Sequence, residues 1–276
     1  MPRILMVTLL ALFARPLAAQ TIPITTCGQT LTLGQTGVLQ NDLDCSAVMG
    51  QCLPTGEPCA INSDCNSQFC VLAPAIIVQA KAKLILNGHT IRGSGVDLLK
   101  NLGQGILLPP KGTLRVQGPG TVTAFHNATV VPQVFPPPQP RLDVRDVTFD
   151  GNYAAVTGLG VVLTNVVFTN NSTIGVFASR LRAKNVTMLD NGGESLEAGV
   201  LNAKNLTIHG SGGVGIRTTS ATLKDSTITD NAMFGTFPYG LDIVASQKLR
   251  LKNTTCNQSS RDQDTLQPWG LCLHDQ

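Results

Sequence analysis

The sequence predicts an all-β protein, a right-handed single-stranded parallel β-helix (solenoid) of roughly eight or more coils with disulfide-bonded ends. A short pattern of alternating apolar residues recurs every 20 residues, and alternation with period two is typical of strands. These stretches are rich in Val, Ile, Thr and Phe, which favour strands over helices. A unit of this length is too short for a βαβ crossover, so each unit is one coil. Parallel connections are nearly always right-handed.

The clearest repeats place a bend at Asn165, Asn185, Asn205 and Asp225, with apolar residues alternating on both sides. We expect each bend amide to hydrogen-bond to its equivalents in the coils above and below, forming a ladder that satisfies buried polar groups. The same register predicts two inward columns, which are Phe149, Phe168, Met188, Ile208 and Ile228, and Leu142, Val161, Leu181, Leu201 and Ala221.

The N-terminal residues 1–20 are predicted to be a signal peptide. They combine a cationic start at Arg3, an apolar run from Ile4 to Ala14 and the small residues Ala18 and Ala19. The apolar run is shorter than the roughly 20 residues that span a bilayer. We therefore expect a secreted or periplasmic protein with no membrane span.

The remaining chain divides into four expected segments: an N-terminal cap at 21–47, a cysteine-rich inserted loop at 48–73, the parallel β-helix at 74–256 and a C-terminal cap at 257–276. The repeat spacing lengthens twice. A proline-rich stretch between Pro132 and Pro140 cannot join a strand ladder and is predicted to project as a loop. A second loop is expected near Phe237.

The chain contains 8 cysteines, an even number that predicts four disulfides in an exported protein. Proximity favours Cys27–Cys45 and Cys256–Cys272. For the central cluster we favour Cys52–Cys65 with Cys59–Cys70, although four cysteines allow three connectivities. A zinc site is the alternative for this cluster.

Composition limits the partners that can be expected. The formal net charge is +3, and only 13% of residues are charged. These values do not point to nucleic acid as a partner. We expect a monomer.

Several motifs resemble the right-handed β-helix proteins of the pectin-lyase-like superfamily, in particular exported bacterial β-helix repeat proteins. They are the opening Cys27-Gly28 to Cys45, the Leu86-Asn87-Gly88 coil, the Asn-x-x-Ile/Phe/Met-x-x-Asn repeats and the ending Trp269-Gly270-Leu271-Cys272. Members of this superfamily include pectate and alginate lyases, polygalacturonases, uronate epimerases and proteins with only binding or structural roles. The paired-aspartate and Asp-Pro-His-Glu signatures of its enzymes are absent from this sequence.

The repeat predicts one outward column that combines charge with aromatic rings: Phe177, Glu197, Arg217 and Phe237, with Tyr239 two residues further on. Aromatic faces stack on sugar rings, and arginine pairs with uronate carboxylates. In a lyase, Arg217 would neutralise or deprotonate the uronate and Glu197 would assist proton transfer. A surface ion pair between exposed hydrophobic residues is the simpler interpretation.

A second outward column places Lys184, Lys204 and Lys224 in successive coils. Like charges at one strand spacing repel each other unless anions neutralise them, which favours an acidic polysaccharide as ligand. Lysines also protect sheet surfaces from aggregation, and that interpretation stays open.

Three functions follow from these patterns. The first is binding of carbohydrate, with acidic polysaccharide favoured. The second is a polysaccharide lyase or related uronate-modifying enzyme, which would be the one case in which calcium is expected as a cofactor. The third is a non-catalytic structural or adhesive surface protein. No other cofactor or metal is expected.

Overall fold

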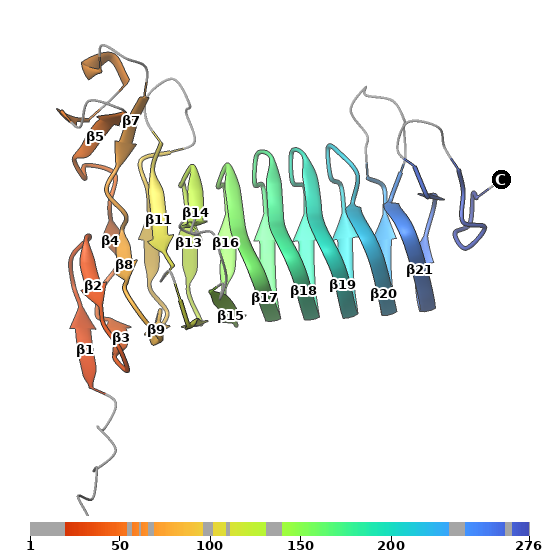
Figure 1. Cartoon of the computed structure of the whole chain (residues 1–276), viewed down its shortest axis with the longest axis horizontal. Coiled ribbons are helices and arrows are strands. Elements are labelled where there is room, and N and C mark those ends of the chain that lie inside the picture. Colours follow the sequence, from red (N-terminus) through yellow and green to blue (C-terminus); the bar gives the residue numbers. More distant parts are fainter. Residues whose placement is uncertain are drawn as a thin grey trace, which may run out of the picture.

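The computed structural model describes residues 20–53, 57–60, 62–65, 69–95, 102–108, 111–130, 140–231, 241–262 and 267–275. This part of the chain forms 22 β-strands and one short 3-10 helix, η1 (Asn62–Asp64). Nearly all strands pair in parallel in one continuous 19-stranded sheet that winds into a long rod (Figure 1). The structure therefore confirms the predicted right-handed parallel β-helix.

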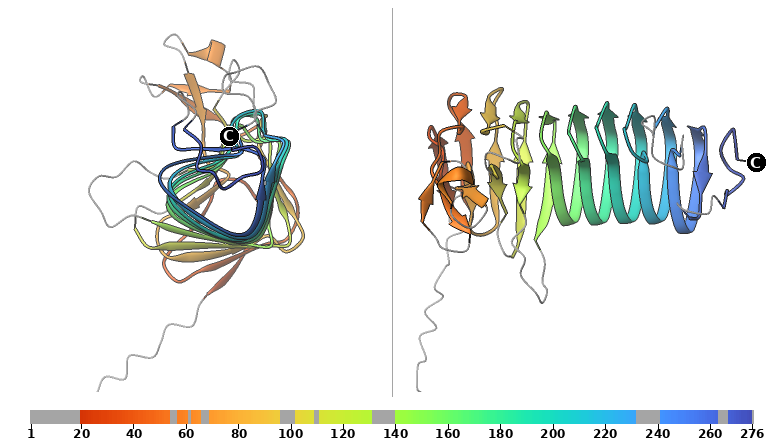
Figure 2. Two further views of the ribbon diagram at one scale, coloured as in Figure 1. Left: turned by 90° about the vertical axis from the view of Figure 1, so that its right-hand side faces the viewer. Right: turned by 90° about the horizontal axis from the view of Figure 1, so that it is seen from above.

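Seen along the axis, the coils are roughly triangular, so the rod has three faces (Figure 2). We call them faces A, B and C, in the order in which the chain meets them within each coil. The early strands of face A are β2 (Gln29–Leu31), β8 (Ile76–Val78), β11 (Gln104–Leu107) and β14 (Asn127–Val130). Those of face B are β1 (Thr21–Ile24), β3 (Thr36–Leu39), β9 (Ala82–Ile85), β12 (Thr113–Gln117) and β15 (Arg141–Arg145). Those of face C are β4 (Leu43–Asp44), β10 (Thr90–Arg92), β13 (Thr121–Thr123) and β16 (Thr148–Asp150).

The later coils are more regular, and each long strand runs around all three faces. These strands are β17 (Ala154–Thr169), β18 (Ile174–Leu189), β19 (Glu194–His209), β20 (Ile216–Thr229) and β21 (Ile243–Cys256), followed by the short β22 (Ser259–Ser260). The register of β17 to β19 advances by 20 residues per coil, as predicted. Both inward columns of apolar residues are buried, and the rings of Phe149 and Phe168 stack with centroids 5.2 Å apart.

The predicted ladder at the bend between faces B and C is present. Asn165 donates to Asp146 at 2.8 Å, and Asn185 and Asn205 each donate to the preceding asparagine at 2.9 Å. The expectation that this ladder is buried was wrong, because the three asparagines are exposed. Their φ angles of 53–54° lie in the left-handed region, which asparagine tolerates better than most residues.

A second, buried ladder lies at the corner between faces C and A. Its members are fully or almost fully buried: Asn152, Asn171, Asn191, Ser211, Asn231 and Asp242. Asn171 donates to Asn191 Oδ1 at 2.9 Å, and Asn152 donates to Asn171 Oδ1 at 3.1 Å. These amides satisfy the polar groups of the corner inside the core, as buried polar groups require.

The cysteine-rich segment leaves the rod at the same corner and folds separately. Its strands β5 (Gly50–Leu53), β6 (Pro58–Cys59) and β7 (Phe69–Leu72) form an antiparallel sheet beside the N-terminal coils (Figure 1). Disulfides Cys52–Cys65 and Cys59–Cys70 hold it together. The other disulfides are Cys27–Cys45 and Cys256–Cys272, so all four join the residues paired above. Among the described residues, no helix is long and apolar enough to cross a bilayer.

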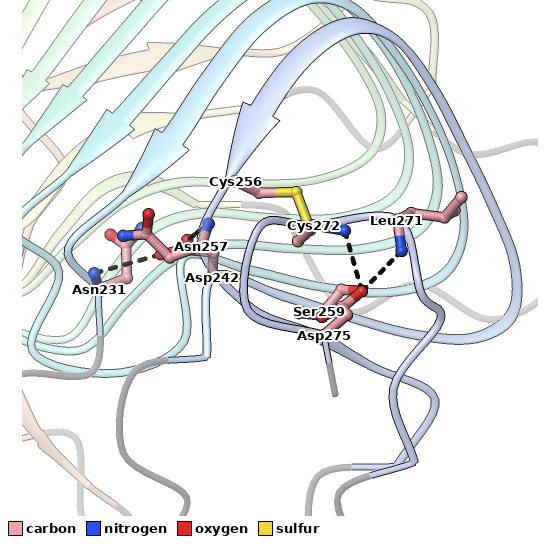
Figure 3. The surroundings of a disulfide bond; sticks show 8 residues. All are labelled: Asn231, Asp242, Cys256, Asn257, Ser259, Leu271, Cys272 and Asp275. Carbon is pink, nitrogen blue, oxygen red and sulfur yellow. Dashed lines mark hydrogen bonds between the residues drawn. A yellow bond between two sulfur atoms is a disulfide. The ribbon is translucent and has the colours of Figure 1, made fainter.

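The C-terminal segment folds back on the last coil (Figure 3). Cys272 is bonded to the inward-facing Cys256, and the Asp275 carboxylate accepts hydrogen bonds from the backbone of Leu271 at 2.8 Å and Cys272 at 3.0 Å. The indole of Trp269 donates to the carbonyl of Ala245 at 3.0 Å. These contacts fix the segment against the end of face A.

Candidate functional site

Face A carries a charged outward column near the C-terminal end of the rod. Phe177 on β18, Glu197 on β19 and Arg217 on β20 are register neighbours. Each alternates with a buried apolar residue of the same strand, as the sequence predicts. The next position of the column is Val244 on β21.

This column lines a groove of about 840 Å³. The corner between faces A and B contributes Ser179, Gly199 and Thr219. The C-terminal segment contributes Arg261, Asp262 and Gln267, and Arg261 lies 4.4 Å from the centroid of the Trp269 ring. The groove thus offers one exposed aromatic ring, two guanidinium groups, carboxylates and hydroxyl groups, a mixture suited to a polar ligand with flat faces.

The close ion pair of Arg217 is with Glu194 rather than with the predicted Glu197. Arg217 Nε lies 2.7 Å from Glu194 Oε1, and Nη2 contacts the same oxygen. Glu194 reaches along the axis because its neighbour in the following coil is Gly213, which has no side chain. A Cβ atom at Gly213 would lie 3.3 Å from Glu194 Cγ. The pair is only partly exposed, with 33% of the Arg217 side chain and 23% of the Glu194 side chain accessible.

Glu197 is the perturbed acid of the groove. Burial raises the pKa of its carboxyl above the ordinary value, the neighbouring Glu194 carboxylate raises it further, and the Arg217 guanidinium opposes both effects. A carboxylic acid with a raised pKa retains its proton closer to neutrality and can donate it to a ligand. The arrangement can therefore place a proton donor beside a fixed positive charge.

This shift predicts a change in pH dependence. The folded state holds the Glu197 proton more tightly than the unfolded chain, so its contribution to stability is present at low pH and is lost as pH rises through the raised pKa. We expect Glu197→Gln to remove this loss, so that the variant gains stability relative to wild type between about pH 4 and about pH 8. Urea denaturation across that range measures the difference, and parallel curves would contradict the shift.

Two predicted site residues, Phe237 and Tyr239, lie outside the described residues. The expected place of Phe237 in the column was wrong, because the register puts Val244 beside Arg217. The chain between β20 and β21 contains extra residues, so counting by 20 fails there. Of the proline-rich stretch predicted to project as a loop, only Pro140 is described, and it is buried.

The predicted lysine column exists but lies on face B. Lys184, Lys204 and Lys224 are successive register neighbours, and Lys252 continues the column in strict register. None of the four lines the groove. The structure therefore separates the predicted substrate-binding residues into a groove on face A and a basic surface on the adjoining face.

The described residues offer no suitable set of ligands for either metal considered from the sequence, zinc or calcium. The sulfur atoms of Cys52, Cys59 and Cys65 lie within 4.8 Å of one another, but all three cysteines form disulfides and cannot act as thiolates. Calcium requires several ionised oxygen ligands. In the groove, Glu194 is paired with Arg217, and the guanidinium groups of Arg217 and Arg261 line the same space, so the residues there do not fit a calcium ion.

Sequence reasoning missed Glu194 and the residues from the C-terminal segment. The signal for Glu194 was present in Gly213, which leaves room beside its side chain in the following coil. Arg261, Asp262 and Gln267 follow the last repeat, and no periodic pattern could have placed them over face A.

The fold and groove define this chain as a right-handed parallel β-helix protein with a polar groove at its C-terminal end. Comparisons with protein-family models, curated proteins and solved structures return no match. The particular ligand must therefore be inferred from the chemistry of the groove.

Proposed function

We propose that this chain is an exported carbohydrate-binding protein of the pectin-lyase-like kind, whose groove holds a segment of acidic polysaccharide. The observation that carries this proposal is the alignment of Phe177, Glu197 and Arg217 along a groove of about 840 Å³. Phe177 is 45% exposed and offers a ring face on which a sugar can stack, while hydroxyl and carboxyl groups beside it match sugar hydroxyl groups.

The acidic character of the ligand is supported by the two guanidinium groups of the groove, Arg217 and Arg261. Guanidinium groups bind carboxylates in a bidentate geometry that an ammonium group cannot reproduce. Export is supported by the four disulfides, which are typical of oxidising compartments outside the cytoplasm.

A second candidate function, a uronate lyase, is favoured by one observation. The Glu197 carboxyl, whose pKa is raised, lies beside the positively charged guanidinium of Arg217. Arg217 would neutralise the uronate carboxylate, which acidifies the adjoining C–H bond, and Glu197 would supply a proton to the departing sugar oxygen. Binding without turnover remains the first proposal, because binding needs only the alignment of Phe177, Glu197 and Arg217, whereas a lyase also needs a base for the C–H proton.

The test is calorimetric titration of the disulfide-intact protein with oligouronates and with neutral oligosaccharides of the same length. We expect binding to the oligouronates, weakened about tenfold to 100-fold by Arg217→Ala and about three- to tenfold by Phe177→Ala. Arg92→Ala is the matched control, since Arg92 is an exposed arginine on face C. Absence of binding to every glycan would sink the proposal in favour of a structural or adhesive rod.

Turnover is followed in the same samples by ultraviolet absorbance from unsaturated uronate ends. An absorbance increase that Arg217→Ala and Glu197→Gln both abolish would establish the lyase. Binding without any increase is the result expected from the first proposal.

A further inference from the structure

Face B carries a concentrated basic patch on its four last coils. Its members are Arg180, Arg182 and Lys184 on β18, Lys204 on β19, Lys224 on β20, and Lys248, Arg250 and Lys252 on β21. They are 8 of the 20 lysines and arginines of the chain. All occupy outward positions that alternate with buried or half-buried apolar residues, so their charged ends point away from one sheet surface.

The patch holds almost no compensating negative charge. Its other outward residues are the neutral Val200, Asn202, Ser220 and Thr222. Among the described residues, the one carboxylate that pairs with the patch is Asp225, whose Oδ2 lies 3.9 Å from Lys224 Nζ.

The earlier coils of the same face are different. There, Asp143 is buried between Arg145, at 3.1 Å, and Arg115, at 3.9 Å, so a carboxylate partly offsets the cations of these coils, which also include Lys83 and Arg141. The next coil presents only Gly160, Val162 and Thr164 at the outward positions. One uncharged coil therefore separates the basic patch on β18 to β21 from the earlier cations of face B.

Packing of the coils does not account for this distribution. Cations in neighbouring coils lie ~4.8 Å apart, and such like-charge neighbours destabilise a sheet. The whole chain has a net charge of only +3, so its charges are segregated by face. A site that binds anions would offset the repulsion.

We propose that the basic patch docks the protein on a lipid surface bearing anionic phosphate headgroups. The arrangement of the charges selects this partner over a linear polyanion. The outer strands β18 and β21 each carry three cations, and the inner strands β19 and β20 carry one each. The charges therefore spread over two dimensions, about 14 Å along the axis and about 13 Å across it. A single extended chain could follow the Lys184–Lys252 column but would leave Arg180, Arg182, Lys248 and Arg250 uncovered.

A lipid surface can match this pattern, because its headgroups diffuse laterally and each cation can meet an anion. Arginine also binds phosphate in a bidentate geometry. The groove is lined by residues of face A and of the C-terminal segment. Faces A and B are different sides of the triangular rod (Figure 2), so docking through face B leaves the groove uncovered. The docking proposal does not depend on what the groove binds.

The test is co-sedimentation of the disulfide-intact protein with vesicles of phosphatidylcholine alone or mixed with phosphatidylglycerol. We expect partitioning only into the mixed vesicles, and loss of partitioning at high salt. Each lysine near an anionic surface contributes about fivefold, so Lys204→Gln combined with Lys224→Gln is expected to lower the partition coefficient about 25-fold. Thermal melting confirms that the variant is folded.

The matched control is Arg92→Gln combined with Lys111→Gln, which removes the same charge from exposed positions outside the patch. This control is expected to partition like wild type. An equal loss in both variants would overturn the proposal in favour of a net-charge effect. Failure to bind mixed vesicles, or binding to soluble polyphosphate without vesicle binding, would equally overturn it.

Discussion

Replacing Asn171 by alanine is expected to lower the free energy of unfolding by about 3 kcal/mol. The Asn171 side chain is fully buried and links its own coil to the coils before and after it. Its Oδ1 accepts hydrogen bonds from the backbone and side-chain nitrogens of Asn152, both at 3.1 Å, and its Nδ2 donates to Phe149 O at 3.2 Å and to Asn191 Oδ1 at 2.9 Å. Alanine leaves these buried groups without partners, and each unsatisfied group is costly.

The matched control is Asn185→Gly in the exposed ladder. Asn185 makes a comparable amide contact with Asn165, at 2.9 Å, but its side chain is in solvent. Glycine also tolerates the left-handed φ of 53° at this position. We expect a loss of no more than a few tenths of a kcal/mol, measured for both variants by urea denaturation. Equal losses would contradict the assignment of the stabilising ladder to the C–A corner.

The second large effect is expected from Cys256→Ser combined with Cys272→Ser. The bond joins residues 16 apart, and removing a disulfide that closes a loop of this length costs about 3 kcal/mol of stability. The same bond fixes the segment that brings Arg261, Asp262 and Gln267 to the groove. We therefore expect weaker oligouronate binding as well as lower stability, measured by calorimetric titration and by urea denaturation.

Cys27→Ser combined with Cys45→Ser separates these two consequences. This bond spans 18 residues, so the expected loss of stability is similar, but it lies at the opposite end of the rod from the groove (Figure 1). The N-terminal variant should bind oligouronates like wild type under conditions where both variants are folded. Undiminished binding by the C-terminal variant would show that the C-terminal segment takes no part in the site.

The sequence was sufficient to predict the solenoid and its inward columns, because period-two alternation within a 20-residue repeat leaves one arrangement of the apolar side chains. It was insufficient to tell which asparagine ladder is buried. Asn165 and Asn171 belong to repeats of the same period, so periodicity cannot distinguish them. The difference lies in the backbone, since Asn165 adopts a left-handed bend that turns its side chain outward, whereas Asn171 fills the corner of the core.

For the candidate site, the repeat correctly placed Phe177, Glu197 and Arg217 together. It failed at Phe237, because extra residues before β21 shift the register to Val244. It also paired Arg217 with Glu197, although Gly213 in the following coil leaves room for Glu194 to reach the guanidinium instead. Residues that follow the last repeat, such as Arg261, are placed by a disulfide and by Trp269, which are tertiary constraints that no local pattern reveals.

The most direct test of the central claim is a crystal structure of the disulfide-intact protein with a bound oligouronate. The account predicts a sugar ring stacked on Phe177 and uronate carboxylates in contact with the guanidinium groups of Arg217 and Arg261. An oligouronate bound on another face, or a groove that stays empty at concentrations that saturate binding in solution, would contradict it.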